Sequence, residues 1–215
     1  ATHHVVSRCI QGFAFLTPHD HIADICRGVL RYSLHVHRET IKLHHYAFLS
    51  NHFHLLLSSA TTPDLARFMC HFKGNLAREL GRVHDWHDSF WQKRYSSEEV
   101  LDEEGLTEIF KYITQNSVKE GLVEHPSQWA GLHGYHQLVE GREVSGPWVN
   151  RSDLYIARKR DKSLQESEFT SIFPVLLSPP PMWAEMFDSR YREHCEKLCE
   201  EALLEATCAR SAGAI

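Results

Sequence analysis

The sequence predicts an α+β fold, with one antiparallel sheet carrying helices on one face and a mostly helical C-terminal extension. The first supporting observation is the order of the elements, which is strand, helix, strand, strand, helix, strand and then a further helix. This βαββαβ order is that of a ferredoxin-like domain. The second is a change near Gly141, after which glycines and prolines repeatedly interrupt the chain. We therefore expect a ferredoxin-like domain over residues 1–140 and an extension over residues 141–215.

The first three strands and the first helix are predicted by side-chain pattern. Residues 3–9 are expected to form a strand, and Thr17 to cap a helix over residues 18–36 that has proline at its first position. Residues 41–49 are rich in β-branched, aromatic and aliphatic side chains, and the turn-like pair Ser50-Asn51 follows them. We therefore expect a hairpin over residues 41–58.

Capping residues locate the elements that come next. A helix over residues 64–83 is opened by Thr62-Pro63 and Asp64, and a strand is expected over residues 95–100. Asp102 can cap a helix over residues 106–118. In the extension, prolines 179–181 precede a last helix expected over residues 182–207. The large side chains that repeat at helical spacing there are Trp183, Phe187, Tyr191, Leu198 and Leu203.

The second strand of the hairpin contains two histidines one residue apart. Alternation along a strand sends His52, His54 and Leu56 to one face and Phe53, Leu55 and Leu57 to the other. The apolar face can be buried while the two imidazoles converge on one point. Because strand histidines are usually surface or satisfied core residues, and the chain has 17 histidines, the pair alone does not establish a metal site.

The helix after Asp102 adds a phenol and an amide to this pair. Leu106, Ile109, Phe110 and Ile113 form an apolar stripe, and at about 100° per residue Asn116 falls within it while Tyr112 lies on its edge. We expect both side chains to point toward the sheet. Each residue type also has a purely structural role: Asn116 can serve the C-terminal end of the helix before Gly121, and Tyr112 can be an edge aromatic.

Three ordered segments resemble one family of enzymes. They are YAFLSNHFHLLL at residues 46–57, FWQKRYSS at residues 90–97 and KYITQNSVKEGLV at residues 111–123. Over about residues 2–140 the chain resembles the REP-associated tyrosine transposases, IS200-like members of the single-tyrosine HUH endonucleases, named for a His-hydrophobic-His signature. The resemblance implies the HUH endonuclease fold, with His52 and His54 as metal ligands, Tyr112 as nucleophile and Asn116 as third ligand or orienting amide.

The resemblance also implies an activity. Such enzymes cut one DNA strand at hairpin-bearing repeats, keep a 5′-phosphotyrosine link and leave a free 3′-OH for strand transfer. The residue types suit this chemistry, since a divalent ion held by two imidazoles and an amide can neutralise a phosphodiester, and mixed nitrogen and oxygen ligands suit Mg²⁺ or Mn²⁺. We therefore expect a metal-dependent transposase-like enzyme acting on single-stranded DNA, as a monomer or homodimer.

The negative net charge of the chain argues against a nucleic-acid-binding function. The net charge is −5, with 13 basic and 16 acidic residues up to and including residue 140 and 10 and 12 after it, whereas nucleic-acid binders are often basic. Any DNA surface must therefore be local. The candidate residues are Arg67, Lys73, Arg78, Trp91, Lys93, Arg94, Arg158, Lys159 and Arg160. Trp91 beside two cations can stack unpaired bases or simply pack in the core, and the run 158–160 can be a solvated surface.

Two other functions stay open on the sequence. The acidic charge favours a non-cleaving module that keeps the fold and binds structured single strands, while a histidine-rich metal-binding protein would not depend on Tyr112. Six cysteines show no CxxC pair, and neither a membrane span nor a signal peptide is visible. We therefore expect reduced thiols and a bacterial cytoplasmic protein, associated with the nucleoid and not with a membrane.

Overall fold

The computed structural model describes residues 1–186 and 188–211, so Phe187, predicted for the last helix, lies outside the described residues. Its strands are β1 (Thr2–Arg8), β2 (Ile41–Phe48), β3 (His52–Ser59), β4 (Ser96–Glu99), β5 (Ser145–Val149) and β6 (Thr170–Pro174). Its helices are α1 (Asp20–Val36), α2 (Thr62–Val83), α3 (Glu103–Lys119), α4 (Tyr135–Leu138), α5 (Arg151–Arg158) and α6 (Asp188–Ser211). The short 3₁₀ turns are η1 (Ile10–Gly12), η2 (Pro126–Gln128), η3 (Glu166–Phe169) and η4 (Pro181–Trp183).

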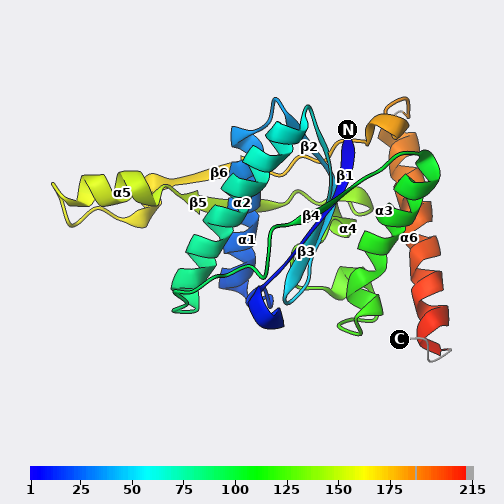
Figure 1. The fold of residues 1–215 in the computed structure, drawn as a ribbon, viewed down its shortest axis with the longest axis horizontal. Helices are drawn as coiled ribbons and strands as arrows, with labels where there is room; N and C mark the ends of the chain where they lie inside the picture. The colour runs from blue at the N-terminus through cyan, green and yellow to red at the C-terminus, as the bar shows by residue number, and fades with distance from the viewer. Residues whose placement is uncertain (187, 212–215) are drawn as a thin grey trace.

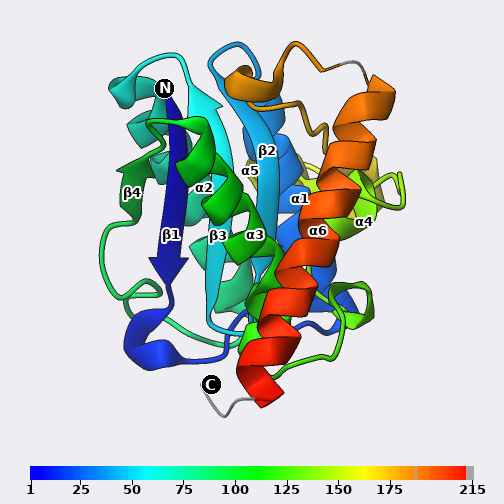
Figure 2. The same cartoon turned by 90° about the vertical axis from the view of Figure 1, so that its right-hand side faces the viewer.

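The main sheet has the strand order β2-β3-β1-β4, and each neighbouring pair is antiparallel (Figure 2). This order, with helices after β1 and β3, confirms the predicted ferredoxin-like α+β fold. As predicted, α1 and α2 lie together on one face (Figure 1). A second helical layer, α3 and α6, covers the other face (Figures 1 and 2).

The second layer follows from the composition of the central strands. Phe53, Leu55 and Leu57 enter the core beneath α1 and α2, as alternation predicts. On the other face Leu56 joins a second core with Phe110 of α3. Because β2 and β3 are buried almost throughout, neither face of the sheet centre can be left in water. Helices are therefore needed on both faces.

Helix capping agrees with the sequence at one helix and differs at another. Asp102 accepts a hydrogen bond of 2.8 Å from the Gly105 amide and so caps α3, as predicted. The predicted cap of α1 is wrong: Thr17 Oγ1 donates to the Ala14 carbonyl at 2.8 Å, and the helix begins only at Asp20. The cap position directly precedes the first helical residue, and it is therefore occupied by His19 and not by Thr17.

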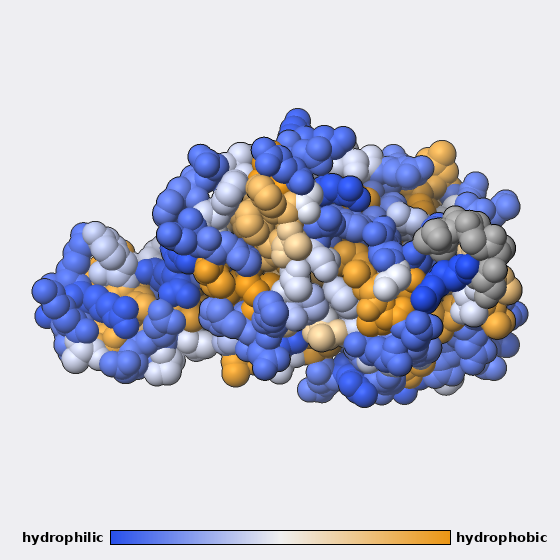
Figure 3. Space-filling model, turned by 90° about the horizontal axis from the view of Figure 1, so that it is seen from below, coloured by the Kyte–Doolittle hydropathy of each residue, from blue (hydrophilic) through white to orange (hydrophobic). Residues whose placement is uncertain are grey.

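The extension begins with an arm. Strands β5 and β6 pair antiparallel, and with α5 at the tip they project from the body (Figures 1 and 3). The base of the arm packs tightly on α1, where a Cβ added at Gly28 would lie 1.9 Å from the Pro147 carbonyl oxygen. Buried Arg31 of α1 also donates to the Gly146 carbonyl at 3.1 Å. These contacts attach the arm to the ferredoxin-like core.

The last helix begins later than the sequence predicts. Trp183 belongs to the separate turn η4, because prolines at 179–181 favour an extended entry and a short turn, and α6 starts at Asp188. Trp183 is buried against the Phe110 ring, with centroids 5.5 Å apart. All six cysteines are free thiols, as predicted. No helix within the described residues is long and apolar enough to cross a membrane.

Candidate active site

The paired histidines lie at the start of β3, on the sheet face that α3 covers. Their ring centroids are 5.0 Å apart and both side chains are buried. Burial, with a smaller effect of nearby Arg8, lowers the pKa of His52 to about 4. Burial, then His52, His4 and Arg8, lower the pKa of His54 to about 2. Both imidazoles are therefore neutral near pH 7, and each keeps a lone pair that a metal could use.

Helix α3 places Asn116 against His54. The Asn116 side chain is 2 % exposed, and its Nδ2 lies 3.0 Å from His54 Nε2. The same helix turn brings Tyr112 over the histidine, with the two ring centroids 5.4 Å apart. Tyr112 is 38 % exposed, so it lies at the border of the core with one side open to solvent. The four site residues predicted from the sequence thus meet in space.

His4 is a member of this cluster that the sequence prediction missed. Its Nε2 lies 3.0 Å from His54 Nδ1, and its ring centroid lies 6.0 Å from that of Tyr112. In the antiparallel register Val6 of β1 pairs with His54 and His4 with Leu56, so His4 and His54 share a face. Strand alternation within residues 3–9 puts His4 on one face of β1, but only the β1–β3 register shows that this face is the one that carries His54.

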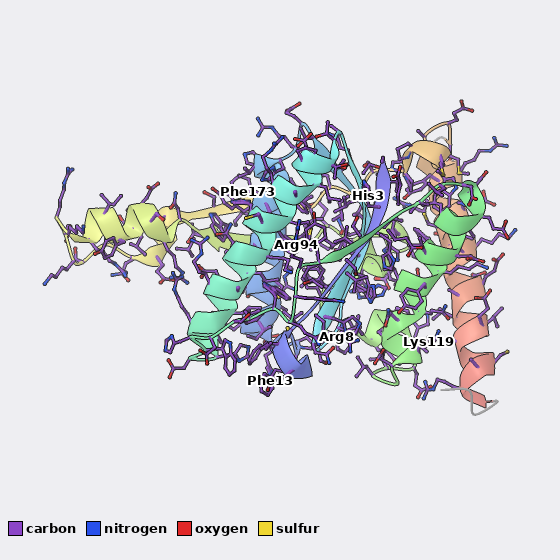
Figure 4. The ribbon with its side chains drawn as sticks, in the orientation of Figure 1. His3, Arg8, Phe13, Arg94, Lys119 and Phe173 are labelled. Carbon is purple, nitrogen blue, oxygen red and sulfur yellow. The ribbon has the colours of Figure 1, made fainter. Side chains whose placement is uncertain are left out.

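Two cations flank the cluster at the same end of the molecule. Arg8 ends β1 and pairs in register with His52, which places it on the histidine face of the sheet. Lys119 ends α3, and its Nζ lies 5.6 Å from the centroid of the Tyr112 ring. Figure 4 shows both side chains at the lower edge of the sheet and of α3. Neither was predicted, because neither stands in a run of basic residues.

Grooves open on both sides of Tyr112. One, of about 600 Å³, is lined by His4, Glu98, Lys111, Gln115 and Glu205 among others. The other, of about 520 Å³, is lined by Asn116, Lys119, Glu120 and Arg210 among others. A chain that passes across the phenol would therefore meet carboxylates on one side and mostly cations on the other. This difference in charge between the two grooves can orient a charged polymer that binds across Tyr112.

Helix α6 supports the tyrosine helix from outside. Lys111, the residue before Tyr112, donates to Glu201 at 2.6 Å and to Glu205 at 3.1 Å. These carboxylates raise the pKa of Lys111. Beneath the ion pairs, Leu198 and Cys199 of α6 join the same core as Phe110. The extension therefore contributes to the position of Tyr112.

The residues of this cluster could supply only part of the coordination shell of a metal ion. Among residues 1–186 and 188–211, no three His, Cys, Asp or Glu side chains are grouped so that they could hold a metal. Two neutral imidazoles and the Asn116 amide remain, which is a set that leaves positions for water or a phosphate oxygen. Asn116 presents its donor Nδ2 to His54 Nε2, so the amide would have to turn its oxygen toward an ion to serve as a ligand, and the resulting ligand set would carry no net charge.

Of the residues predicted to contact DNA, Lys73 and Trp91 are used within the fold. Lys73 is buried, donates to the Lys93 carbonyl at 3.0 Å and lies 5.1 Å from the Trp91 ring centroid. Burial, then Arg94, lowers its pKa to about 8. Trp91 donates to the Lys73 carbonyl at 3.1 Å and packs against Phe53. These two side chains hold the loop before β4, while Lys93 and Arg94 are exposed.

The other predicted cations lie away from the histidines. Arg67 pairs with Asp64, and Arg78 donates to Asn75 at 3.0 Å, both on α2 beyond the opposite face of the sheet. Arg158, Lys159 and Arg160 lie at the end of α5 on the arm, across the molecule from α3 (Figure 1). The structure therefore does not join these residues and the histidine cluster into one surface.

Comparison with known proteins gives a matching family and solved structures of similar fold. The family model described as "Transposase IS200 like" matches residues 3–116. A structure described as a REP-associated tyrosine transposase bound to a REP hairpin is 18% identical, with TM-score 0.50, over 63% of this chain and 77% of that one. A candidate transposase from Deinococcus radiodurans R1 is 20% identical, with TM-score 0.40, over 53% of this chain and 88% of that one. No curated protein matches the chain.

Proposed function

Because the chain belongs to the IS200-like transposase family, we propose that it cuts and rejoins single-stranded DNA with Tyr112 as the nucleophile. The observation that carries this proposal is the meeting of β3 and α3. The Tyr112 ring lies 5.4 Å from the His54 ring, and Asn116 lies 3.0 Å from His54 Nε2. A nucleophile, two neutral imidazoles and a buried amide thus converge at one solvent-accessible point.

The proposed reaction is a transesterification at phosphorus. The Tyr112 oxygen attacks the phosphodiester, the bond to the 3′ oxygen breaks, and the phenol proton is lost while the departing 3′ oxygen gains one. The product is a 5′-phosphotyrosine link and a free 3′-OH. In the reverse direction an acceptor 3′-OH attacks the link and releases Tyr112. Bond energy is conserved, so rejoining needs no external energy source.

His52, His54 and Asn116 would hold Mg²⁺ or Mn²⁺, which when bound supplies charge neutralisation at a non-bridging phosphate oxygen. The histidines contribute by staying neutral, which burial secures. Arg8 and Lys119 would attract the phosphates on either side of the reacting bond. Exposed Lys93 and Arg94 can extend this contact along the loop before β4.

The proposed substrate is a single strand beside a hairpin. The similar structure in complex with a REP hairpin shares the fold of this chain, and this likeness supports a hairpin-bearing repeat as the partner. We further propose that residues 141–215 act as an extension that holds the tyrosine helix, because Lys111 and the adjoining core connect α3 to α6.

The test uses labelled single-stranded hairpin oligonucleotides with Mn²⁺ or Mg²⁺ and a denaturing gel. Wild type should give a protein-linked DNA band that disappears with chelator, with Tyr112→Phe and with His54→Gln. Tyr155→Phe is the matched control, since this tyrosine lies on the arm and is exposed. Hairpin binding without an adduct in any metal would reject cleavage and favour the non-cleaving binding module.

A further inference from the structure

Each of the two paired histidines has a hydrogen-bond partner at its Nδ1 atom. His52 Nδ1 lies 2.6 Å from Asn51 Oδ1, and His54 Nδ1 lies 3.0 Å from His4 Nε2. A neutral imidazole carries one proton, so its partner at one nitrogen decides whether the other is free to bind a ligand. Neither partner belongs to the set of residues proposed above for catalysis or metal binding.

The orientation of the Asn51 amide is determined by its second partner. Asn51 Nδ2 donates to the Gly12 carbonyl at 3.2 Å, and a carbonyl oxygen can only accept. The amide oxygen must then face His52, so His52 Nδ1 carries the proton and donates it. His52 Nε2 is left with its lone pair. The Gly12 carbonyl is itself placed by a turn in which Gln11 and Gly12 both have positive φ, 51° and 72°.

The same argument applies to His54. Asn116 Nδ2 is a donor and lies 3.0 Å from His54 Nε2, so this nitrogen accepts and carries no proton. The proton of His54 is therefore on Nδ1, and it is donated to His4 Nε2. His4 is placed for this by the β1–β3 register, which puts it on the same sheet face, two residue pairs along from His54.

From these contacts we propose that Asn51 and His4 are positioning residues that accept the Nδ1 protons of His52 and His54. Both Nε2 atoms then stay unprotonated, and a divalent ion can take the place of the Asn116 donor at His54 Nε2. This inference deepens the proposed function, on which its metal depends. The tautomers themselves are a property of the metal-free protein. Losing a hydrogen bond of this kind behind a ligating histidine typically weakens metal binding by roughly 10–100-fold.

The test has two readouts besides activity. Long-range ¹H–¹⁵N NMR of histidine-labelled, metal-free protein reports which ring nitrogen is protonated, with His52→Gln and His54→Gln used for assignment. Loss of the free Mn²⁺ signal in electron paramagnetic resonance reports affinity. We expect Nδ1 protonation at both histidines in wild type, a changed tautomer of His52 in Asn51→Leu, and Mn²⁺ affinity lower by roughly 10–100-fold in Asn51→Leu and in His4→Leu. His4→Leu tests the His54 contact through affinity, because the Asn116 donor at Nε2 also favours Nδ1 protonation of His54.

Conservative variants separate positioning from folding. Asn51→Asp and His4→Gln keep an acceptor for the Nδ1 proton, so both should restore the wild-type tautomer and most of the affinity. His3→Leu is the control, since it removes the neighbouring imidazole from the other face of β1. The inference is overturned if the wild-type rings are protonated at Nε2, if Asn51→Leu leaves the His52 tautomer unchanged, or if His4→Leu leaves the Mn²⁺ affinity unchanged. Correct tautomers without any Mn²⁺ binding or DNA cleavage would reject the proposed function alone.

Discussion

Lowering the pH from about 7.5 to about 5.5 should destabilise the protein, because the fold keeps His44 neutral. His44 lies in β2, where the pairing with β3 shifts register, and its side chain is 1 % exposed. Its Nδ1 lies 2.7 Å from the Ser178 carbonyl oxygen and its Nε2 lies 2.7 Å from Ser58 Oγ. Burial lowers its pKa to about 4, against a smaller opposing effect of the Ser178 carbonyl.

The size of the effect follows from proton binding in the two states. The unfolded imidazole, with a pKa of about 6.5, binds about 0.9 proton at about pH 5.5, whereas the folded one binds almost none. Because the unfolded state binds more protons, stability is fully present above about pH 6.5 and is lost as the pH falls toward about 4. Integration from about pH 7.5 to about pH 5.5 gives a loss on the order of 1.4 kcal/mol for this one group.

Urea unfolding at both pH values measures this loss. Wild type includes the contributions of all its buried histidines, so the His44 share is the amount by which the loss shrinks in His44→Gln. His21→Gln is the control, since this histidine is exposed at the start of α1. If wild type and His44→Gln lose equal stability within about 0.5 kcal/mol, the argument from burial is refuted.

Three further predictions concern packing, the tyrosine helix and metal binding. Gly28→Ala should destabilise by at least about 1–3 kcal/mol because its Cβ would clash with the arm, whereas Gly74→Ala, with nothing within 4 Å, should stabilise by about 0.5–1 kcal/mol in urea unfolding. Lys111→Met should lower the free energy of unfolding by about 0.5–1 kcal/mol at low salt and by less at high salt, as measured by urea unfolding. Lys197→Met should lower it by less, because its ion pair with Glu201 is 4.0 Å long. Equal losses in the two variants would contradict the ion-pair argument. Mn²⁺ at about 100 times its Kd should stabilise wild type by about 2.7 kcal/mol, and His54→Gln should lose most of this gain in thermal unfolding; an equal gain in both would place the ion elsewhere.

The central part of the fold was predictable because its signals are local. The hairpin, Asp102 as a cap and the two faces of β3 depend on alternation and on neighbouring residues, and all three agree with the structure. Thr17 was mispredicted because the chain remains non-helical for two residues after it and α1 starts only at Asp20, which the local Thr17-Pro18 pattern does not indicate. The start of α6 was also mispredicted. The helical spacing of large side chains extends back to Trp183, but Trp183 belongs to a separate turn that follows the prolines.

The candidate site divides along the same line. The sequence by itself determined the chemical types and their separate faces: His52 and His54 on one side of a strand, and Asn116 with Tyr112 on the sheet side of a helix. Only the tertiary structure decided that His4 and Arg8 join them, because β1 reaches β3 through a register that no short-range pattern specifies. It also decided that Lys73 is buried and that α5, with its basic end, lies across the molecule from α3. A sequence carries the side chains and their local periodicity, whereas the distances between them depend on how whole elements pack.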